Sequence, residues 1–162
     1  VVNQPVNDIG ISEEEWKLGS MFTGEAKKII PGSGGSSGSP YGLMKFLLAL
    51  ESGKIVDEAS SLEIKRLLYM TATRIRYASS WSLNEAAVYF KSGSLYQCRE
   101  EEGYKCEKYM GNVNNYMNSV IIVEHPDGTS YMVVLMSNVL KRNSASDHNT
   151  IASKIDQAVR KK

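Results

Sequence analysis

The stretch from Val88 to Tyr96 constrains the fold more than any other, because it combines a strand pattern with residues that strands disfavour. Its β-branched and aromatic residues predict a β-strand, yet Lys91-Ser92-Gly93-Ser94 lies in its middle, where glycine weakens pairing. A ligand would account for this pattern, since Gly93 admits another backbone, Lys91 offers a cation to a carboxylate, and the two serines offer hydroxyls. We therefore expect an edge strand that receives an extended, anionic ligand.

The N-terminal part predicts a helix that begins at Ser12. Ser12 is a typical N-cap residue and Glu15 is its capping-box partner, so the helix is expected to run toward Ile30. Residues 32–39 follow and consist only of glycine and serine, which predicts a flexible loop. Such a segment could be a natural mobile loop or a linker installed in place of a deleted segment, and the sequence leaves both readings open.

Two further helices are expected before the strand. Ser39 as N-cap and Pro40 at the first helical position predict a helix over residues 41–52, which Gly53 ends. A second helix is predicted with Ser60 as its N-cap. The apolar residues of both helices are expected to lie in the core and to carry no chemistry.

The C-terminal part predicts a hairpin and a last helix. Apolar runs over residues 118–124 and 130–138 flank Pro126-Asp127-Gly128-Thr129, a typical hairpin turn. Both runs are apolar on both faces, so helices are expected to cover both faces of the sheet. One cover is the last helix, capped by Ser146 or Asp147. His148, in its first turn, is expected to be a surface residue, and His125 is expected to be unremarkable.

The only cysteines, Cys98 and Cys106, flank a short polar excursion after the Lys-Ser-Gly strand. This spacing favours a disulfide that closes a small loop, and such a bond would imply an oxidising compartment. Two reduced thiols are the alternative. Together with His125 and His148 the cysteines match no zinc spacing, so we expect no metal and no cofactor.

The charge balance argues against two classes of partner. The 162 residues include 19 basic and 18 acidic ones, a net charge of +1, which gives no electrostatic footprint for nucleic acid or for an anionic membrane. No apolar run is long enough to span a bilayer. The chain begins with Val1-Val2, without Met or a signal peptide, and is therefore expected to be a processed product, a fragment or an engineered piece.

Lys91-Ser92-Gly93-Ser94 resembles the Lys-Thr/Ser-Gly-Thr/Ser element of the serine β-lactamase and penicillin-binding protein superfamily. The expected order of helices, Lys-Ser-Gly strand, hairpin and last helix is similar to the C-terminal half of a class A β-lactamase domain along nearly the whole chain. The implied fold is α+β, an antiparallel sheet flanked by helices, incomplete without an N-terminal segment. We expect a helical part over residues 1–87 and three strands with the last helix over residues 88–162, in one domain.

The resemblance implies acylation of a serine nucleophile by a β-lactam or a D-alanyl-D-alanine peptide. Lys91 would hold the substrate carboxylate, and Ser92 would hydrogen-bond to the same group. Gly93 would allow close approach, and the backbone N–H of Ser94 would be one oxyanion donor. Glu15-Trp16-Lys17-Leu18 also resembles the Glu-x-x-Leu of the class A omega loop, whose glutamate activates the deacylating water; for Glu15 we favour the capping role over this catalytic one.

The chain departs from the family pattern, because no serine is followed three residues later by lysine. The nucleophile and its base are thus missing, and residues 118–138 contain no arginine to help bind a carboxylate. We expect the C-terminal portion of a periplasmic or secreted bacterial serine hydrolase, completed by an N-terminal segment that carries the nucleophile. The alternatives are a catalytically inactive penicillin-binding-fold module, and a free-standing α+β interaction domain whose resemblance is spurious.

Overall fold

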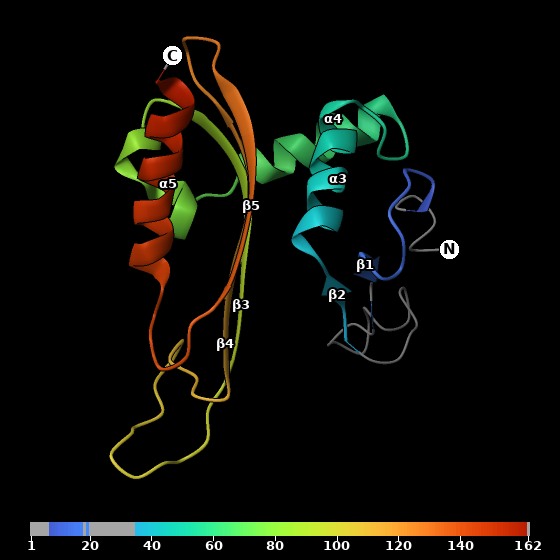
Figure 1. The fold of residues 1–162 in the computed structure, drawn as a ribbon. Helices are drawn as coiled ribbons and strands as arrows, with labels where there is room; N and C mark the ends of the chain where they lie inside the picture. Colours follow the sequence, from blue (N-terminus) through green and yellow to red (C-terminus); the bar gives the residue numbers. More distant parts are fainter. Residues whose placement is uncertain (1–6, 18, 20–34, 162) are drawn as a thin grey trace. The chain divides into compact units, whose positions relative to one another are not determined.

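The computed structural model describes residues 7–17, 19 and 35–161. The chain divides into two compact units, Val1–Lys65 and Arg66–Lys162, each of which is considered by itself (Figure 1). The helices are α3 (Pro40–Glu51), α4 (Glu58–Tyr69) and α5 (Ala145–Arg160), with short 3-10 helices η1 (Arg76–Ser79) and η2 (Trp81–Leu83). The strands are β1 (Trp16–Lys17), β2 (Ser37–Gly38), β3 (Ala87–Gln97), β4 (Asn114–Glu124) and β5 (Ser130–Asn138).

In the first unit a turn, and not a helix, follows Ser12. The backbone N–H of Ser12 donates to the Glu15 carboxylate at 2.9 Å, and the N–H of Glu15 donates to the Ser12 hydroxyl at 3.4 Å. These are the reciprocal bonds of a capping box. The chain then enters β1, which pairs with β2. The helix prediction is therefore wrong over residues 13–17, because strand pairing extends the backbone there, and its continuation over residues 20–30 lies outside the described residues.

The described part of the glycine- and serine-rich segment makes specific hydrogen bonds. Ser37–Gly38 pairs antiparallel with Trp16–Lys17. The Ser36 hydroxyl accepts a bond from the N–H of Gly19 at 3.0 Å. Residues 36–39 are therefore anchored to β1 and to the start of α3, whereas residues 32–34 lie outside the described part of the chain.

The start of α3 is confirmed as predicted, while α4 starts differently. The Ser39 hydroxyl accepts from the N–H of Gly42 at 3.0 Å, and Pro40 opens the helix. Before α4, the Asp57 carboxylate accepts from the N–H of Ser60 at 2.7 Å. The cap is thus Asp57 and not Ser60, because the helix begins at Glu58, one turn earlier than its Ser-Glu pattern predicted.

The second unit contains an antiparallel sheet in the order β3-β4-β5, which leaves β3 and β5 at its edges. Figure 1 shows α5 lying along one face of this sheet. The predicted hairpin turn between β4 and β5 is present, with the N–H of His125 bonded to the carbonyl of Thr129 at 2.9 Å and Gly128 at a φ of 84°. A three-stranded antiparallel sheet flanked by helices confirms the predicted fold class.

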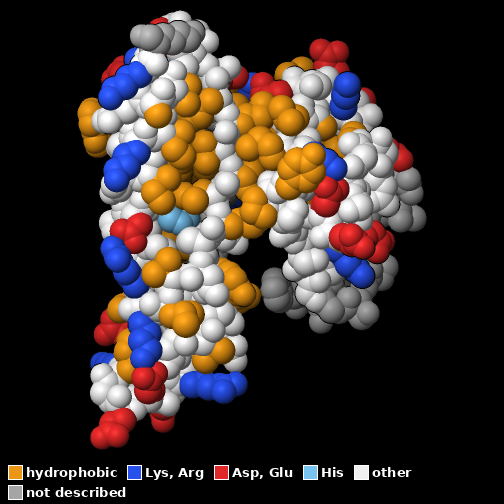
Figure 2. All heavy atoms as spheres, viewed as in Figure 1, with side chains coloured by type: hydrophobic (Ala, Val, Ile, Leu, Met, Phe, Trp, Pro, Cys, Tyr) orange, Lys and Arg blue, Asp and Glu red, His pale blue; other side chains and the backbone are white. Residues whose placement is uncertain are grey.

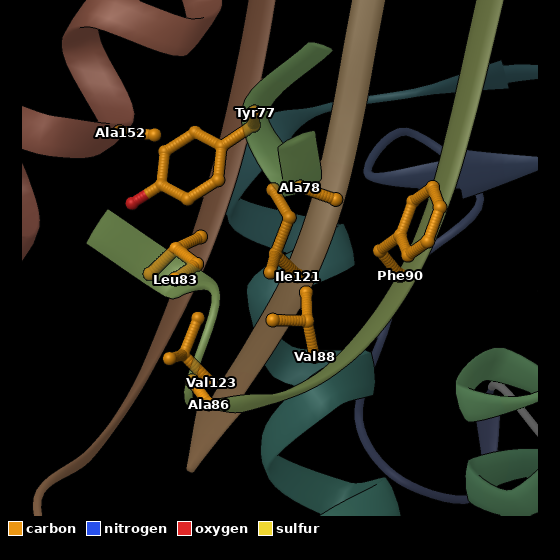
Figure 3. Packing of buried hydrophobic residues seen from close by; sticks show 9 residues of the cluster. All are labelled: Tyr77, Ala78, Leu83, Ala86, Val88, Phe90, Ile121, Val123 and Ala152. Atoms are coloured by element: carbon orange, nitrogen blue, oxygen red, sulfur yellow. The ribbon is translucent and has the colours of Figure 1, made fainter. Parts of the chain in front are cut away.

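The core of this unit lies between the sheet and α5. Alternate residues of β3 and β4 face the helix, and the short helices η1 and η2 fill the space beside it (Figure 3). The buried cluster consists of Tyr77, Ala78, Leu83, Ala86, Val88, Phe90, Ile121, Val123 and Ala152. Full burial of each larger side chain contributes about 1.5–3 kcal/mol. This packing fixes the N-terminal half of β3, from which the Lys-Ser-Gly segment extends.

The predicted disulfide is confirmed. Cys98 and Cys106 are bonded, with their Cα atoms 5.9 Å apart. The bond closes a loop that leaves the sheet directly after β3 (Figure 1). Among the described residues, none of the helices is long and apolar enough to cross a membrane.

Candidate functional site

The Lys91–Ser94 segment lies on β3, an outer strand of the sheet. The sequence predicted an edge strand at this place. β3 pairs with β4 on one side, Lys91 opposite Val120 and Gly93 opposite Asn118, and no described strand pairs with its other side. Edge strands leave alternate N–H and C=O groups open to an extended ligand. A Cβ atom placed on Gly93 would have no atom within 4 Å, so this point of the strand is open to close approach.

The side chains of the segment alternate between the two faces of the sheet. Ser92 and Ser94 share the face of the buried Phe90, and the Ser92 hydroxyl lies 3.1 Å from the hydroxyl of Ser119 on β4. Lys91 is exposed on the opposite face, and its ammonium donates to the backbone carbonyl of Ser92. The lysine thus folds back onto the backbone of its own strand.

Arg76 reaches the same segment and was missed by the sequence analysis. Its Nη1 donates to the carbonyl of Gly93 and its Nη2 donates to the Ser94 hydroxyl, both at 3.0 Å. Burial lowers the pKa of Arg76, while the Tyr109 hydroxyl raises it. Among the described residues, no carboxylate pairs with this guanidinium. Residues 118–138 contain no arginine, so the arginine that contacts this segment comes from η1.

Two hydrogen bonds stabilise the turn that carries Arg76 and link it to α5. Arg76 has a φ of 56°, a left-handed conformation that few residues other than glycine adopt. The Ser79 hydroxyl donates to the Arg76 carbonyl at 2.8 Å, and the side-chain amide of Asn149 on α5 donates to the Ser79 hydroxyl at 3.3 Å. No periodicity in the sequence signals such a turn, which explains why the arginine was overlooked.

Lys91 and Arg76 both donate hydrogen bonds to the backbone of this segment. They contact adjacent peptide groups of one edge strand, Lys91 from one face of the sheet and Arg76 through a serine on the other face. Charge-assisted hydrogen bonds from such groups to a carboxylate are about twice as strong as neutral ones. The arrangement suits a ligand that lies along β3 and carries a carboxylate.

Glu15 lies in the first compact unit and is fully engaged there. Its two carboxylate oxygens lie 2.8 and 3.0 Å from the ammonium of Lys45, and one of them also accepts the N–H of Ser12. The Lys45 hydrogen bond, and then the Ser12 backbone bond, lower the pKa of Glu15. Its capping geometry is observed, whereas its catalytic role stays a prediction.

Both histidines are buried, which corrects the surface prediction for His148. His148 is 1% exposed, and its Nε2 lies 2.8 Å from the Ser137 hydroxyl. Burial, and then the charge of Arg76, lower its pKa against the opposing effect of Asp147. The helix begins at Ala145, so His148 faces the sheet on the stripe of Ala152. His148 precedes Ala152 by four residues, a helical spacing that could have indicated from the sequence that both face the core.

His125 also has a specific environment. Its Nε2 lies 2.7 Å from Oδ1 of Asp156, which in turn accepts the hydroxyl of Tyr131 at 2.9 Å. Asp156 is 2% exposed. This buried group ties the hairpin to α5. Elsewhere, too, the described ranges contain no group of three or more His, Cys, Asp or Glu placed to hold a metal ion.

A model of the β-lactamase enzyme family matches residues 4–161, nearly the whole chain. The protein therefore belongs to this family, within the serine β-lactamase and penicillin-binding protein superfamily. No curated protein matched the chain.

Solved structures show the same fold. A β-lactamase from Chitinophaga pinensis is similar with a TM-score of 0.67 at 19% identity, over 98% of this chain and 54% of that one. A class A β-lactamase from Bacteroides cellulosilyticus has a TM-score of 0.62 at 18% identity, over 98% of this chain and 51% of that one. PBP-A, in an acyl-enzyme complex with penicillin G, has a TM-score of 0.62 at 16% identity, over 99% and 51%. The chain thus spans about half the length of these structures.

Proposed function

We propose that this chain supplies the carboxylate-binding wall of a serine hydrolase that transfers or hydrolyses the acyl group of a β-lactam or a D-alanyl peptide. The observation that carries the proposal is the placement of two cations, Lys91 and Arg76, on the backbone of one open edge strand. Membership of the β-lactamase family and the likeness to a penicillin-acylated PBP-A support it.

Each residue of the segment has a role in this proposal. The ammonium of Lys91 and the guanidinium of Arg76 hold the substrate carboxylate, and the Ser92 hydroxyl donates to it. Gly93 lets the substrate lie against the strand. The backbone N–H of Ser94 stabilises the oxyanion, an interaction that contributes about 3 kcal/mol in serine hydrolases.

The serine nucleophile comes from outside residues 1–162 in this proposal, since no Ser-x-x-Lys occurs in the sequence. An N-terminal segment of the same protein would bring the serine and its base to β3. We place the protein in the periplasm or outside a bacterial cell, because the Cys98–Cys106 disulfide persists in oxidising compartments.

A second candidate is a penicillin-binding module without catalysis. The engagement of Glu15 by Lys45 favours it, because this contact leaves that carboxylate a weak base for water. In this case the carboxylate site on β3 serves recognition alone.

Ligand binding to the protein of residues 1–162 tests the carboxylate wall. Benzylpenicillin is titrated by calorimetry into the wild type and into Lys91→Ala and Arg76→Ala, with Lys154→Ala, an exposed α5 cation, as the matched control. Loss of one charge-assisted contact is expected to raise Kd about tenfold or more, and Lys154→Ala is expected to leave Kd unchanged. Equal Kd values for all four proteins would refute the proposal that Lys91 and Arg76 bind the substrate carboxylate.

Intact-mass spectra separate the enzyme from the inactive module. The protein that also carries its N-terminal segment is incubated with benzylpenicillin, denatured and weighed, and is then digested so that the peptide masses locate any adduct. A gain of the penicillin mass on that segment supports acyl transfer, while binding without any mass gain favours the module. An adduct on residues 1–162 would place the nucleophile within this chain and contradict the proposal.

A further inference from the structure

The loop that joins β3 to β4, residues 98–113, is firmly anchored. Its first half is closed by the Cys98–Cys106 disulfide. Its second half is tied back by Asn112, whose side-chain oxygen accepts the N–H of Arg99 at 2.8 Å and whose side-chain nitrogen donates to the Arg99 carbonyl at 2.9 Å. The loop therefore holds its side chains at defined places beside the end of β3.

One of these side chains is Tyr109, which returns to β3. Its ring lies edge-on to the ring of Tyr96, with the centroids 5.7 Å apart. Tyr96 is two residues beyond Ser94 on the same face of β3, about 7 Å along the strand. Tyr109 has a φ of 63°, a conformation that is uncommon for a bulky residue and that often accompanies a functional role.

The tyrosine pair lies beside the Arg76 cation. Arg76 donates to the Ser94 hydroxyl at 3.0 Å, and Tyr96, whose ring contacts Tyr109, follows Ser94 by two residues on the same face of β3. No described carboxylate balances the charge of Arg76. A cation without a counter-ion next to two aromatic rings suits a ligand that carries both a carboxylate and a planar ring.

One ring of the pair is available to a ligand. Tyr96 is 40% exposed, while Tyr109 is partly buried and has the ammonium of Lys108 at 4.9 Å from its centroid. Tyr109 thus supports the ring of Tyr96 and leaves exposed area beside it. Figure 2 shows hydrophobic side chains among acidic and basic ones on the end of this unit that the loop forms.

We propose that Tyr96 and Tyr109 form an aromatic wall that selects carboxylated acyl substrates with an aryl side group. Arg76 and Lys91 hold the carboxylate, and the ligand extends along β3 so that its ring packs against Tyr96. This inference rests on the proposed function and names the substrate class of the same site. The disulfide loop is the element that builds the wall, because it positions Tyr109.

A matched pair of ligands tests the wall. Benzylpenicillin and 6-aminopenicillanic acid share the fused ring and the carboxylate and differ by the phenylacetyl group. Their Kd values are measured by calorimetry for the wild type and for Tyr96→Ser, Tyr109→Ser and Tyr109→Phe. Tyr116→Ser is the control, because Tyr116 has a similar exposure, 42%, and lies on the other face of the sheet.

The wild type is expected to bind benzylpenicillin about tenfold more tightly than 6-aminopenicillanic acid. Tyr96→Ser and Tyr109→Ser should abolish this preference without changing the Kd of 6-aminopenicillanic acid, whereas Tyr109→Phe and Tyr116→Ser should keep it. The aromatic-wall proposal would be refuted if the wild type bound both ligands with equal affinity, or if the serine variants lost affinity equally for both ligands. Either result would leave the proposed function unaffected. A wild type that binds neither ligand would overturn both.

Discussion

Arg76 and Ser94 are 18 positions apart in the sequence and are joined by a hydrogen bond of 3.0 Å from the guanidinium to the hydroxyl. The bond brings a cation from a short 3-10 helix to the edge strand that carries the Lys-Ser-Gly motif. In the function that we propose, Arg76 and Lys91 hold the substrate carboxylate from the two faces of this strand. The predictions below concern this site and the elements that support it.

Gly93→Ala should weaken ligand binding without changing the stability of the protein. A Cβ at this position meets no atom within 4 Å, so the free energy of unfolding should change by no more than about 0.5 kcal/mol. A ligand that lies against the strand would meet the new methyl group, and we expect the Kd of benzylpenicillin to rise about tenfold. Urea unfolding and calorimetry on the same protein give both values, and an unchanged Kd would show that no ligand passes Gly93.

Gly111→Ala is the matched glycine control. A Cβ there would lie 2.0 Å from the carbonyl oxygen of Asn114 and 2.6 Å from that of Gln97, both of them backbone atoms. The strand ends would have to separate, so we expect a loss of about 2 kcal/mol or more in the free energy of unfolding.

The sequence predicted the elements with strong local signals. Pro40, Gly128 and the two cysteines act through their own covalent geometry, so the start of α3, the hairpin turn and the disulfide were all foreseen. Trp16 was placed in a helix because the capping box of Ser12 looks the same whether a helix or a single turn follows.

The candidate site was foreseen only in part. Lys91 to Ser94 stood out because strands rarely contain such residues. Arg76 reaches the site through a left-handed turn and a tertiary contact, and neither leaves a pattern in the sequence. The burial of His148 depends on where α5 begins, a boundary that capping signals place only within a residue or two.

Removal of the disulfide should destabilise the protein moderately. Cys98 and Cys106 are separated by 8 positions, and the chain-entropy account gives about 2 to 3 kcal/mol for a loop of this size. We expect this loss in urea unfolding of the Cys98→Ser/Cys106→Ser variant and in the wild type with reductant. The reductant should have no further effect on the double variant, and equal stability of the oxidised and reduced wild type would contradict the prediction.

His148 should make stability depend on pH. Its pKa is lowered in the folded protein from an ordinary value of 6.5, so the unfolded chain binds more protons between the two values. The contribution of His148 to the free energy of unfolding should be fully present above pH 6.5. It should decrease as the pH drops below this value. His148→Gln, whose amide can still reach Ser137, should lose this part of the slope between pH 5 and 7; parallel curves for the two proteins would speak against it.

Asp156→Ala should be among the more damaging single changes. It would leave two buried donors, the Nε2 of His125 and the hydroxyl of Tyr131, without their acceptor, at a cost of about 3 kcal/mol. Asp147→Ala removes a carboxylate from an exposed pair with Arg142 and should cost less than about 1 kcal/mol. Thermal unfolding of both variants compares them, and similar losses would mean that burial of Asp156 contributes little.

The anchoring of the loop after β3 offers a place for a reporter group. Its two halves are fastened independently, by the disulfide and by Asn112, while Gly103 at its tip is exposed and has a φ of 73°. A fluorophore introduced through a non-cysteine chemistry at Glu102 would therefore be carried by an anchored loop, the same loop that contains Tyr109. We expect its emission to change when the adjoining strand is occupied, which would make the protein its own optical sensor.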